Sequence, residues 1–217
     1  MSMKKFHYQD AIKFGWERMK ENFWFFFGSL MTIGLVSWIS EDVDKLSENN
    51  PSFDLTILSI LLLMLMLILD LGMMNISLKI HDKKEVTYTD LFNLYPRILN
   101  YFLTNLLYFL IVFGGLLLFI VPGIIWAIKF QFCSYLIADK NLGPIEALKE
   151  SSRLTRDAKM DLFFFGFIVF IVVLAGALCL VIGLFFAIPT VMVAYAYVFR
   201  KLQENKIEII KEPESKK

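Results

Sequence analysis

The chain has 217 residues, of which 57% are hydrophobic, 16% aromatic and 20% charged, and its mean hydropathy is +0.60. Soluble domains contain roughly 45–50% apolar residues, so this composition excludes an ordinary soluble protein and predicts a membrane protein. The formal net charge of +1 gives no basis for nucleic-acid binding, and we predict none.

Residues 1–22 form a charged segment without the apolar stretch of a cleavable signal peptide, so we expect the first apolar run to stay as a span. Apolar residues in this segment recur at helical spacing and predict an amphipathic helix in the plane of the membrane interface. These residues are Tyr8, Ile12, Trp16, Met19 and Phe23.

Six apolar runs are candidate membrane spans, because a spanning helix needs about 20 apolar residues to cross a hydrocarbon core of about 30 Å. The predicted spans are about 23–40, 55–78, 99–121, 123–138, 161–182 and 184–199. The fourth and sixth have only about 16 residues each, or roughly 24 Å of helix. Two alternatives stay open for them: they cross fully, or they form re-entrant hairpins.

Spans three and four are joined by a predicted tight turn at Pro122 and Gly123, and spans five and six by one at Gly183. The segment 123–128 resembles 183–188 at an offset of 60 residues, and this register aligns Lys129 with Pro189. We therefore predict that each hairpin breaks its second helix at the same depth.

Two further amphipathic stretches precede the later hairpins. The capping-box spacing from Thr87 to Asp90 predicts a short helix before the third span, and Pro144 opens a helix that runs to Thr155. The predicted fold class is therefore all-α: a polytopic membrane protein with about six transmembrane helices in three hairpins, each preceded by a cytoplasmic interfacial helix.

This plan divides the chain into an interfacial segment at 1–22, a membrane domain at 23–200 and a charged cytoplasmic tail at 201–217. Lys and Arg number five before the first span, four in 79–98, five in 139–160 and six from Arg200 onward, against one in 41–54. The positive-inside rule then predicts that both termini are cytoplasmic.

Two strongly ionisable residues fall well inside predicted spans, Asp70 and Lys129, both expected near mid-membrane. A charge there costs on the order of 2.5–3.5 kcal/mol, so such residues usually face the bundle interior and pair. One reading is a structural ion pair, or a Lys129 satisfied by backbone carbonyls; the other is a proton or substrate site. Polar residues nearer the cytoplasmic half are expected to join helices; these are Asn75, Asn100, Thr104, Asn105 and Gln131.

The sequence offers little catalytic chemistry. His7 and His81 are its two histidines and lie far apart, which excludes a His-rich metal site, and no nucleophile elbow or phosphate-binding glycine loop is found. Cys133 and Cys179 are expected to be small buried hydrophobes. We predict no enzyme activity, no metal and no cofactor.

The basic residues Arg153, Arg156 and Lys159 follow the third interfacial helix. They are predicted either to contact anionic lipid headgroups, at about 1 kcal/mol each, or only to orient the protein.

The run from Val121 to Lys129, followed by 135–155 with its Ala-Leu-x-x-Ser segment, resembles uncharacterised bacterial polytopic membrane proteins related to the glycerophosphoryl diester phosphodiesterase membrane domain. The resemblance is clearest over about residues 85–200. It implies a six-helix protein of the bacterial cytoplasmic (plasma) membrane. The phosphodiesterase activity is not expected, because the residues after the last span are too few for a catalytic domain.

Two functions follow as hypotheses. The first is a non-catalytic membrane module that organises lipids or a membrane-protein partner, including another copy of itself. The alternative is a small transporter of a polar solute or lipid that uses Asp70 and Lys129.

Overall fold

A computed structural model of the protein describes residues 7–50 and 52–211. These residues form nine α-helices and two short 3-10 helices, joined by turns and short loops. Six stretches are long and apolar enough to cross a membrane. The predicted class, an all-helical multi-span membrane protein, is therefore confirmed.

Three hairpins carry most of the chain. Their bounds are α2 (Phe23–Asn49) with α3 (Phe53–His81), α4 (Ile98–Leu118) with α5 (Ile120–Phe130), and α8 (Lys159–Leu178) with α9 (Leu180–Lys211). The other elements are α1 (Tyr8–Glu21), η1 (Tyr88–Leu91), η2 (Tyr95–Arg97), α6 (Cys133–Lys140) and α7 (Pro144–Leu154). A helical segment thus precedes each hairpin: α1, the η1–η2 pair, and α7.

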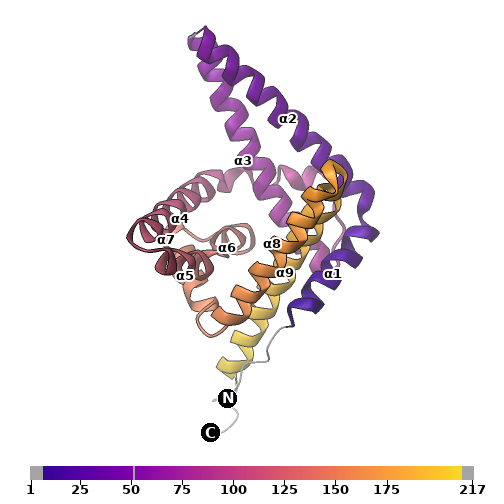
Figure 1. The fold of residues 1–217 in the computed structure, drawn as a ribbon, viewed down its shortest axis with the longest axis vertical. Helices are drawn as coiled ribbons and strands as arrows, with labels where there is room; N and C mark the ends of the chain where they lie inside the picture. The colour runs from indigo at the N-terminus through magenta and orange to yellow at the C-terminus, as the bar shows by residue number, and fades with distance from the viewer. Residues whose placement is uncertain (1–6, 51, 212–217) are drawn as a thin grey trace.

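The end of α2 and the start of α3 lie at one end of the molecule, and the last turns of α9 lie at the other (Figure 1). α1 runs alongside α9 (Figure 1), and Phe14 and Tyr197 bring their ring centroids within 5.1 Å. At Gly15 the two helices touch, because a side chain there would overlap the carbonyl oxygen of Thr190. The amphipathic α1 therefore buries one side against α9.

Burial divides the molecule into two parts. In α3 the exposed large apolar side chains lie between Phe53 and Met64, whereas the buried ones lie between Leu69 and Ile80. We call the packed part the base: α1, residues 69–80 of α3, η1, α6, α7 and residues 193–202 of α9, which share two hydrophobic clusters. The remaining parts of the three hairpins, called the arms, expose many large apolar side chains as lipid-facing surfaces do. Where the arms leave the base, four of their residues are buried in the same clusters: Phe26, Tyr101, Leu162 and Phe165.

The second segment before a hairpin is shorter than predicted, since it forms two 3-10 turns. Its predicted capping box is confirmed: Asp90 Oδ2 accepts the Thr87 backbone N–H at 2.9 Å. Asp90 also accepts bonds from Lys79 at 2.6 Å and Asn93 at 2.8 Å, which fastens η1 to the end of α3.

The positions predicted for the hairpin turns and breaks need correction. The chain turns at Phe119 and at Cys179, while Pro122 lies in the first turn of α5, where its missing N–H costs nothing. α9 continues through Pro189 without a break. A proline inside a helix removes one backbone hydrogen bond, and α9 stays helical on both sides of it.

Gly123 and Gly183 have a different role from the predicted one, because each allows the two helices of its hairpin to approach closely. A Cβ at Gly123 would lie 2.6 Å from Leu116 Cδ2, and a Cβ at Gly183 would overlap the carbonyl oxygen of Gly176. The α4–α5 and α8–α9 hairpins thus share this contact, in agreement with the predicted repeat.

We expect Gly183→Ala to lower the stability of the purified protein by about 1–2 kcal/mol, because the new methyl group meets backbone, which cannot move aside cheaply. Gly166→Ala is the matched control, since no atom lies within 4 Å of its added Cβ. That control should be neutral, or more stable by up to about 1 kcal/mol. Thermal unfolding in detergent measures both, and equal effects would contradict the close contact.

Candidate functional site

The predicted fourth span is a broken helix. α5 ends at Phe130 and α6 begins at Cys133, so 123–138 is two short helices instead of one. No proline or glycine lies between them, since the two intervening residues are Gln131 and Phe132. The break must therefore be stabilised from elsewhere in the chain.

Ser151 of α7 bridges the break. Its hydroxyl accepts the Phe132 backbone N–H at 3.2 Å and donates to the Lys129 carbonyl at 3.1 Å. Thr155 Oγ1 lies 3.0 Å from the same carbonyl. Both hydroxyl residues are fully buried, so these bonds replace the ones that a continuous helix would make.

Two more carbonyls of α5 are satisfied by side chains. Gln131 Nε2 donates to the Ile128 carbonyl at 3.1 Å, and the Tyr108 hydroxyl lies 3.4 Å from the Ala127 carbonyl. The backbone carbonyls of Ala127, Ile128 and Lys129 at the end of α5 therefore all have side-chain partners. A ligand would find few free hydrogen-bond acceptors there.

The other end of α6 is held by Arg97. Its Nη1 donates to the carbonyls of Ile137 at 3.1 Å and Ala138 at 2.6 Å. A guanidinium at the C-terminal end of a helix pairs with its free carbonyls and its negative dipole. α6, with eight residues, is thus fixed at both ends by side chains from other elements.

A charged cluster joins the C-terminal ends of α3 and α6 to α9. Arg200 reaches Asp82 with Nη2 at 2.8 Å and Nε at 3.1 Å, and Asp139 with Nη1 at 2.8 Å. His81 lies 3.1 Å from Asp82, and Gln203 donates to Asp139 at 3.1 Å. We call Arg200, Asp82 and Asp139 the arginine cluster.

The partial burial of Asp82 raises the pKa of its carboxyl, but the hydrogen bonds from His81 and Arg200 and the nearby positive charge outweigh that effect. The pKa of Asp82 consequently falls below its ordinary value. The carboxylate is therefore stabilised in its charged form at neutral pH.

The predicted pairing of Asp70 with Lys129 is not formed among the described residues. α3 packs on α4, α6 and α9, whereas α5 packs on α4, α7 and α8, so the two helices are not close neighbours. The Lys129 ammonium instead lies 5.0 Å from the centre of the Phe130 ring. The two residues have opposite charges and similar predicted depths, but the packing of the helices keeps them apart.

Asp70 lies where α3 passes from its half with exposed apolar side chains into the base. Its side chain is exposed and makes no hydrogen bond or ion pair with the described residues. The Tyr101 hydroxyl lies within electrostatic range of it.

One of the five polar residues predicted to join helices is seen to do so among the described residues. Asn105 Oδ1 accepts from the Ser134 hydroxyl at 3.2 Å and so connects α4 to α6. Thr104 is fully buried, and its hydroxyl has no partner among the described residues.

Residues 95–210 match a family described as a domain of unknown function, DUF7847. The chain belongs to the DUF7847 family. The matched region holds α4 to α9 and therefore the broken helix, Arg97, Ser151 and Arg200, while Asp70 and Asp82 lie outside it.

Two mycobacterial relatives of this DUF7847 chain are named as uncharacterised proteins. The protein Rv2560 of Mycobacterium tuberculosis (strain H37Rv) and Mb2590 of Mycobacterium bovis are each 30% identical over 149 residues, which is 68% of this chain. The chain spans 45% of the length of these relatives. No solved structure matches, and no comparison shows the predicted link to the phosphodiesterase membrane domain.

The three basic residues predicted to contact lipid are all exposed in this DUF7847 chain, but they separate into two groups. Arg153 approaches Glu150 at 3.8 Å, and Lys206 binds the same carboxylate at 2.7 Å. Arg156 and Lys159 have no carboxylate within 4.0 Å among the described residues.

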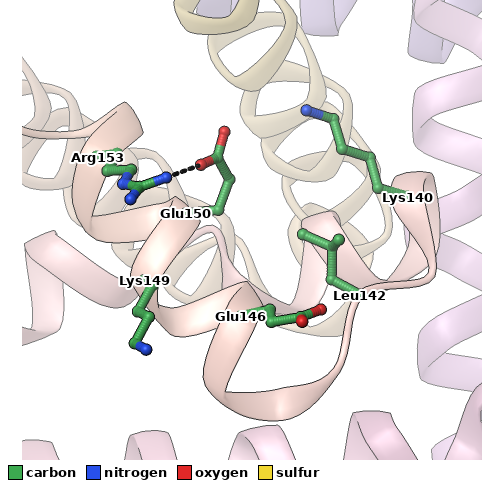
Figure 2. A pocket seen from close by; sticks show the side chains of 6 residues that line it. All are labelled: Lys140, Leu142, Glu146, Lys149, Glu150 and Arg153. Atoms are coloured by element: carbon green, nitrogen blue, oxygen red, sulfur yellow. Dashed lines mark ion pairs between the residues drawn. The ribbon is translucent and has the colours of Figure 1, made fainter.

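A groove of about 340 Å³ lies beside Arg153, and Figure 2 shows the side chains that line it. It is lined by Lys140, Leu142, Glu146, Lys149, Glu150 and Arg153. Lys149 points away from Lys140 and from the Arg153–Glu150 pair (Figure 2). The three cations do not converge, so the groove offers no shared anion site.

The part of the chain that the structure describes holds no group of three or more metal-ligating side chains. Cys133 is buried, as predicted, but Cys179 is exposed at the α8–α9 turn.

Sequence reasoning missed Ser151, Thr155, Arg97 and the arginine cluster. One signal was present: Ser151 lies on the same stripe of α7 as Ala147 and Leu154, both buried. A hydroxyl on the buried side of an amphipathic helix requires a partner. The arginine cluster had no such signal, since 118 residues separate Arg200 from Asp82.

Proposed function

We propose that this chain is a non-catalytic membrane module that organises lipids or membrane-protein partners around its hairpins. The division into a packed base and exposed apolar arms carries this proposal. In the arms, large apolar side chains such as Leu61 and Phe109 are 60% and 59% exposed, and lipid or another membrane helix must cover them.

The base is suited to a supporting role. Two hydrophobic clusters and the arginine cluster join α1, α3, α6, α7 and α9, which fixes the directions in which the arms leave. A base packed in this way holds the lipid-facing helices at fixed positions relative to one another. The Lys and Arg distribution supports a base at the cytoplasmic face, with the N- and C-termini also cytoplasmic.

The test combines gentle release from native membranes with reconstitution of the full chain. Native mass spectrometry should find a bound protein, or a lipid enriched over the bulk membrane, in the wild type. Liposomes that contain the protein should move no solute from a broad polar panel faster than empty ones. Solute flux that Asp70→Asn abolishes would contradict the proposal.

A transporter is the second candidate, supported by the discontinuous α5–α6 helix and by the unpartnered Asp70. Transporters place substrate sites at broken helices, where freed backbone groups bind the substrate. In this chain Ser151 and Thr155 already occupy those groups, so the non-catalytic module is the better supported of the two.

The resemblance to the phosphodiesterase membrane domain stays a hypothesis about origin. It adds no catalytic residue to this proposal.

A further inference from the structure

α1 lies along α9 and keeps a charged outer face. Its Trp16 ring centroid lies 6.2 Å from that of Phe186, and its Phe14 ring centroid lies 5.1 Å from that of Tyr197. From Phe186 to Tyr197 α9 rises about 16 Å, so α1 accompanies it over that length. The opposite face of α1 exposes charged side chains at helical spacing. They are Lys13, Glu17 and Lys20.

α8 lies along the same part of α9 but keeps an apolar outer face. A Cβ added at Gly176 would lie 2.8 Å from Ala187 Cβ, and the ring centroids of Phe165 and Tyr195 are 5.0 Å apart. No charged residue follows Asp161 in α8. Four large apolar side chains, each 44–62% exposed, lie on its outer face. They are Phe163, Phe167, Phe170 and Leu174.

The two helices contact different faces of α9. α1 meets α9 at Phe186, Thr190 and Tyr197, while α8 meets it at Ala187 and Tyr195. At 3.6 residues per turn these faces are roughly a third of a turn apart. The same part of α9 is therefore flanked by a charged surface and by an apolar surface that point in different directions.

These surfaces limit how the hairpin can lie in a bilayer. If α9 crossed the hydrocarbon core of about 30 Å, α1 would follow it through about half of that thickness. The charged face of α1 would then lie in lipid, where such charges are costly. If α9 lay wholly in water, nothing would cover the apolar face of α8. An α9 that runs along the membrane surface satisfies both conditions, because α8 then faces the acyl chains and α1 faces the headgroups and water.

We infer that the α8–α9 hairpin lies along the membrane surface within one leaflet and does not cross the bilayer. The Lys and Arg distribution favours the cytoplasmic leaflet. For the sixth predicted span, this selects a helix that does not cross over one that crosses fully. The inference goes beyond the proposed function, because it assigns a bilayer surface to each face and depends on neither a selected lipid nor a protein partner.

α2 offers a contrast within the same chain. It begins beside the start of α9, where the ring centroids of Phe23 and Phe186 are 5.4 Å apart, and extends to the end of the molecule opposite the last turns of α9 (Figure 1). Its exposed apolar side chains run from Phe27 to Trp38, 38% and 61% exposed, with no charged residue between them. α2 is therefore expected to cross the bilayer, and it provides the matched control.

The experiment measures the depth of nitroxide spin labels on the full chain in vesicles of phosphatidylcholine and phosphatidylglycerol. Single cysteines replace the four exposed α8 residues in turn, in a Cys179→Ser background, while the buried Cys133 stays. Collisions with oxygen, which dissolves in lipid, and with a water-soluble nickel chelate report each depth. The variants are Phe163→Cys, Phe167→Cys, Phe170→Cys and Leu174→Cys.

Along α8 the four label depths should differ by less than about 5 Å, one helical turn. The matched α2 labels cover a similar helical rise of about 16 Å and should change in depth toward the bilayer midplane. A depth change along α8 as large as that along α2 would overturn the inference. If a label perturbs the fold, Phe164→Cys or Ile171→Cys replaces it, since both residues are exposed. The α2 variants are Phe27→Cys, Met31→Cys, Leu35→Cys and Trp38→Cys.

Labels at Lys13→Cys and Lys20→Cys test the charged face of α1. At both positions, collisions with the nickel chelate should exceed those with oxygen. An excess of oxygen collisions would place α1 in the hydrocarbon, and protection from both reagents would show that protein covers it. Either result would overturn the assignment of this face to headgroups and water. The native mass spectrometry and flux tests of the proposed function do not depend on these depths, so the inference and the proposed function fail separately.

Discussion

Replacing Ser151 by alanine should lower the free energy of unfolding by about 2–3 kcal/mol. The change leaves the Phe132 backbone N–H without a partner and removes one of two bonds to the Lys129 carbonyl. Both groups are enclosed by α5, α6 and α7, where water cannot replace the missing bonds. Thermal unfolding in detergent measures the loss, at about 2–4 °C per kcal/mol for a chain of this size.

Ser152→Ala is the matched control, because the Ser152 hydroxyl makes no hydrogen bond with the described residues. It should change stability by less than about 0.5 kcal/mol. Thr155→Ala should have a smaller effect than Ser151→Ala, since the Lys129 carbonyl keeps its bond from Ser151. If Thr155→Ala is the more damaging change, the bridge across the break is not the main stabilising contact.

The membrane spans could be predicted from the sequence because the requirement for them is local. A segment that crosses lipid must satisfy its own backbone and present apolar side chains, so composition over about 20 residues suffices. The capping box at Thr87 was predictable for the same reason, since its two partners are three residues apart.

The repeat predicted a break in the second helix of two hairpins, one beside Lys129 and one at Pro189. α5 ends at Phe130, close to the first position, whereas α9 passes through Pro189, so the repeat did not show which break forms or what stabilises it. The decisive bonds come from Ser151, nineteen residues after Phe132. A break that depends on a tertiary contact has no local signature.

The predicted ion pair between Asp70 and Lys129 is absent among the described residues for a related reason. Asp70 and Lys129 were matched by sign and by distance from the ends of their spans, but pairing also depends on which helices are neighbours and how each is rotated. Here α4 and α6 contact α3, and α5 belongs with α7 and α8.

The largest effect is expected at the arginine cluster. Arg200→Met should lower the free energy of unfolding by about 3 kcal/mol. The side chains of Arg200, Asp82 and Asp139 are 19%, 22% and 17% exposed. Losing the guanidinium leaves two carboxylates partly buried near each other without their main counter-charge. Removing one partner of a buried pair typically costs 3–5 kcal/mol, and the remaining exposure places this case at the lower end.

The shape of the arginine side chain is part of this prediction. Nε and Nη2 bind both oxygens of Asp82 while Nη1 binds Asp139, and a lysine ammonium cannot form this fork. Arg200→Lys should therefore recover only part of the loss. Adding Asp82→Asn and Asp139→Asn to Arg200→Met should also recover part, because it removes the two stranded charges.

Arg153→Met is the control for the loss of an arginine as such. Its side chain is 73% exposed and its ion pair with Glu150 spans 3.8 Å, so the change should cost less than about 0.5 kcal/mol. Unfolding in detergent at neutral pH compares all of these variants. A similar small loss for Arg200→Met would mean that solvent already screens the cluster and that apolar packing alone joins α3, α6 and α9. A large loss that the added Asn substitutions partly reverse would show that the Arg200 guanidinium is a major contact between α9 and the ends of α3 and α6.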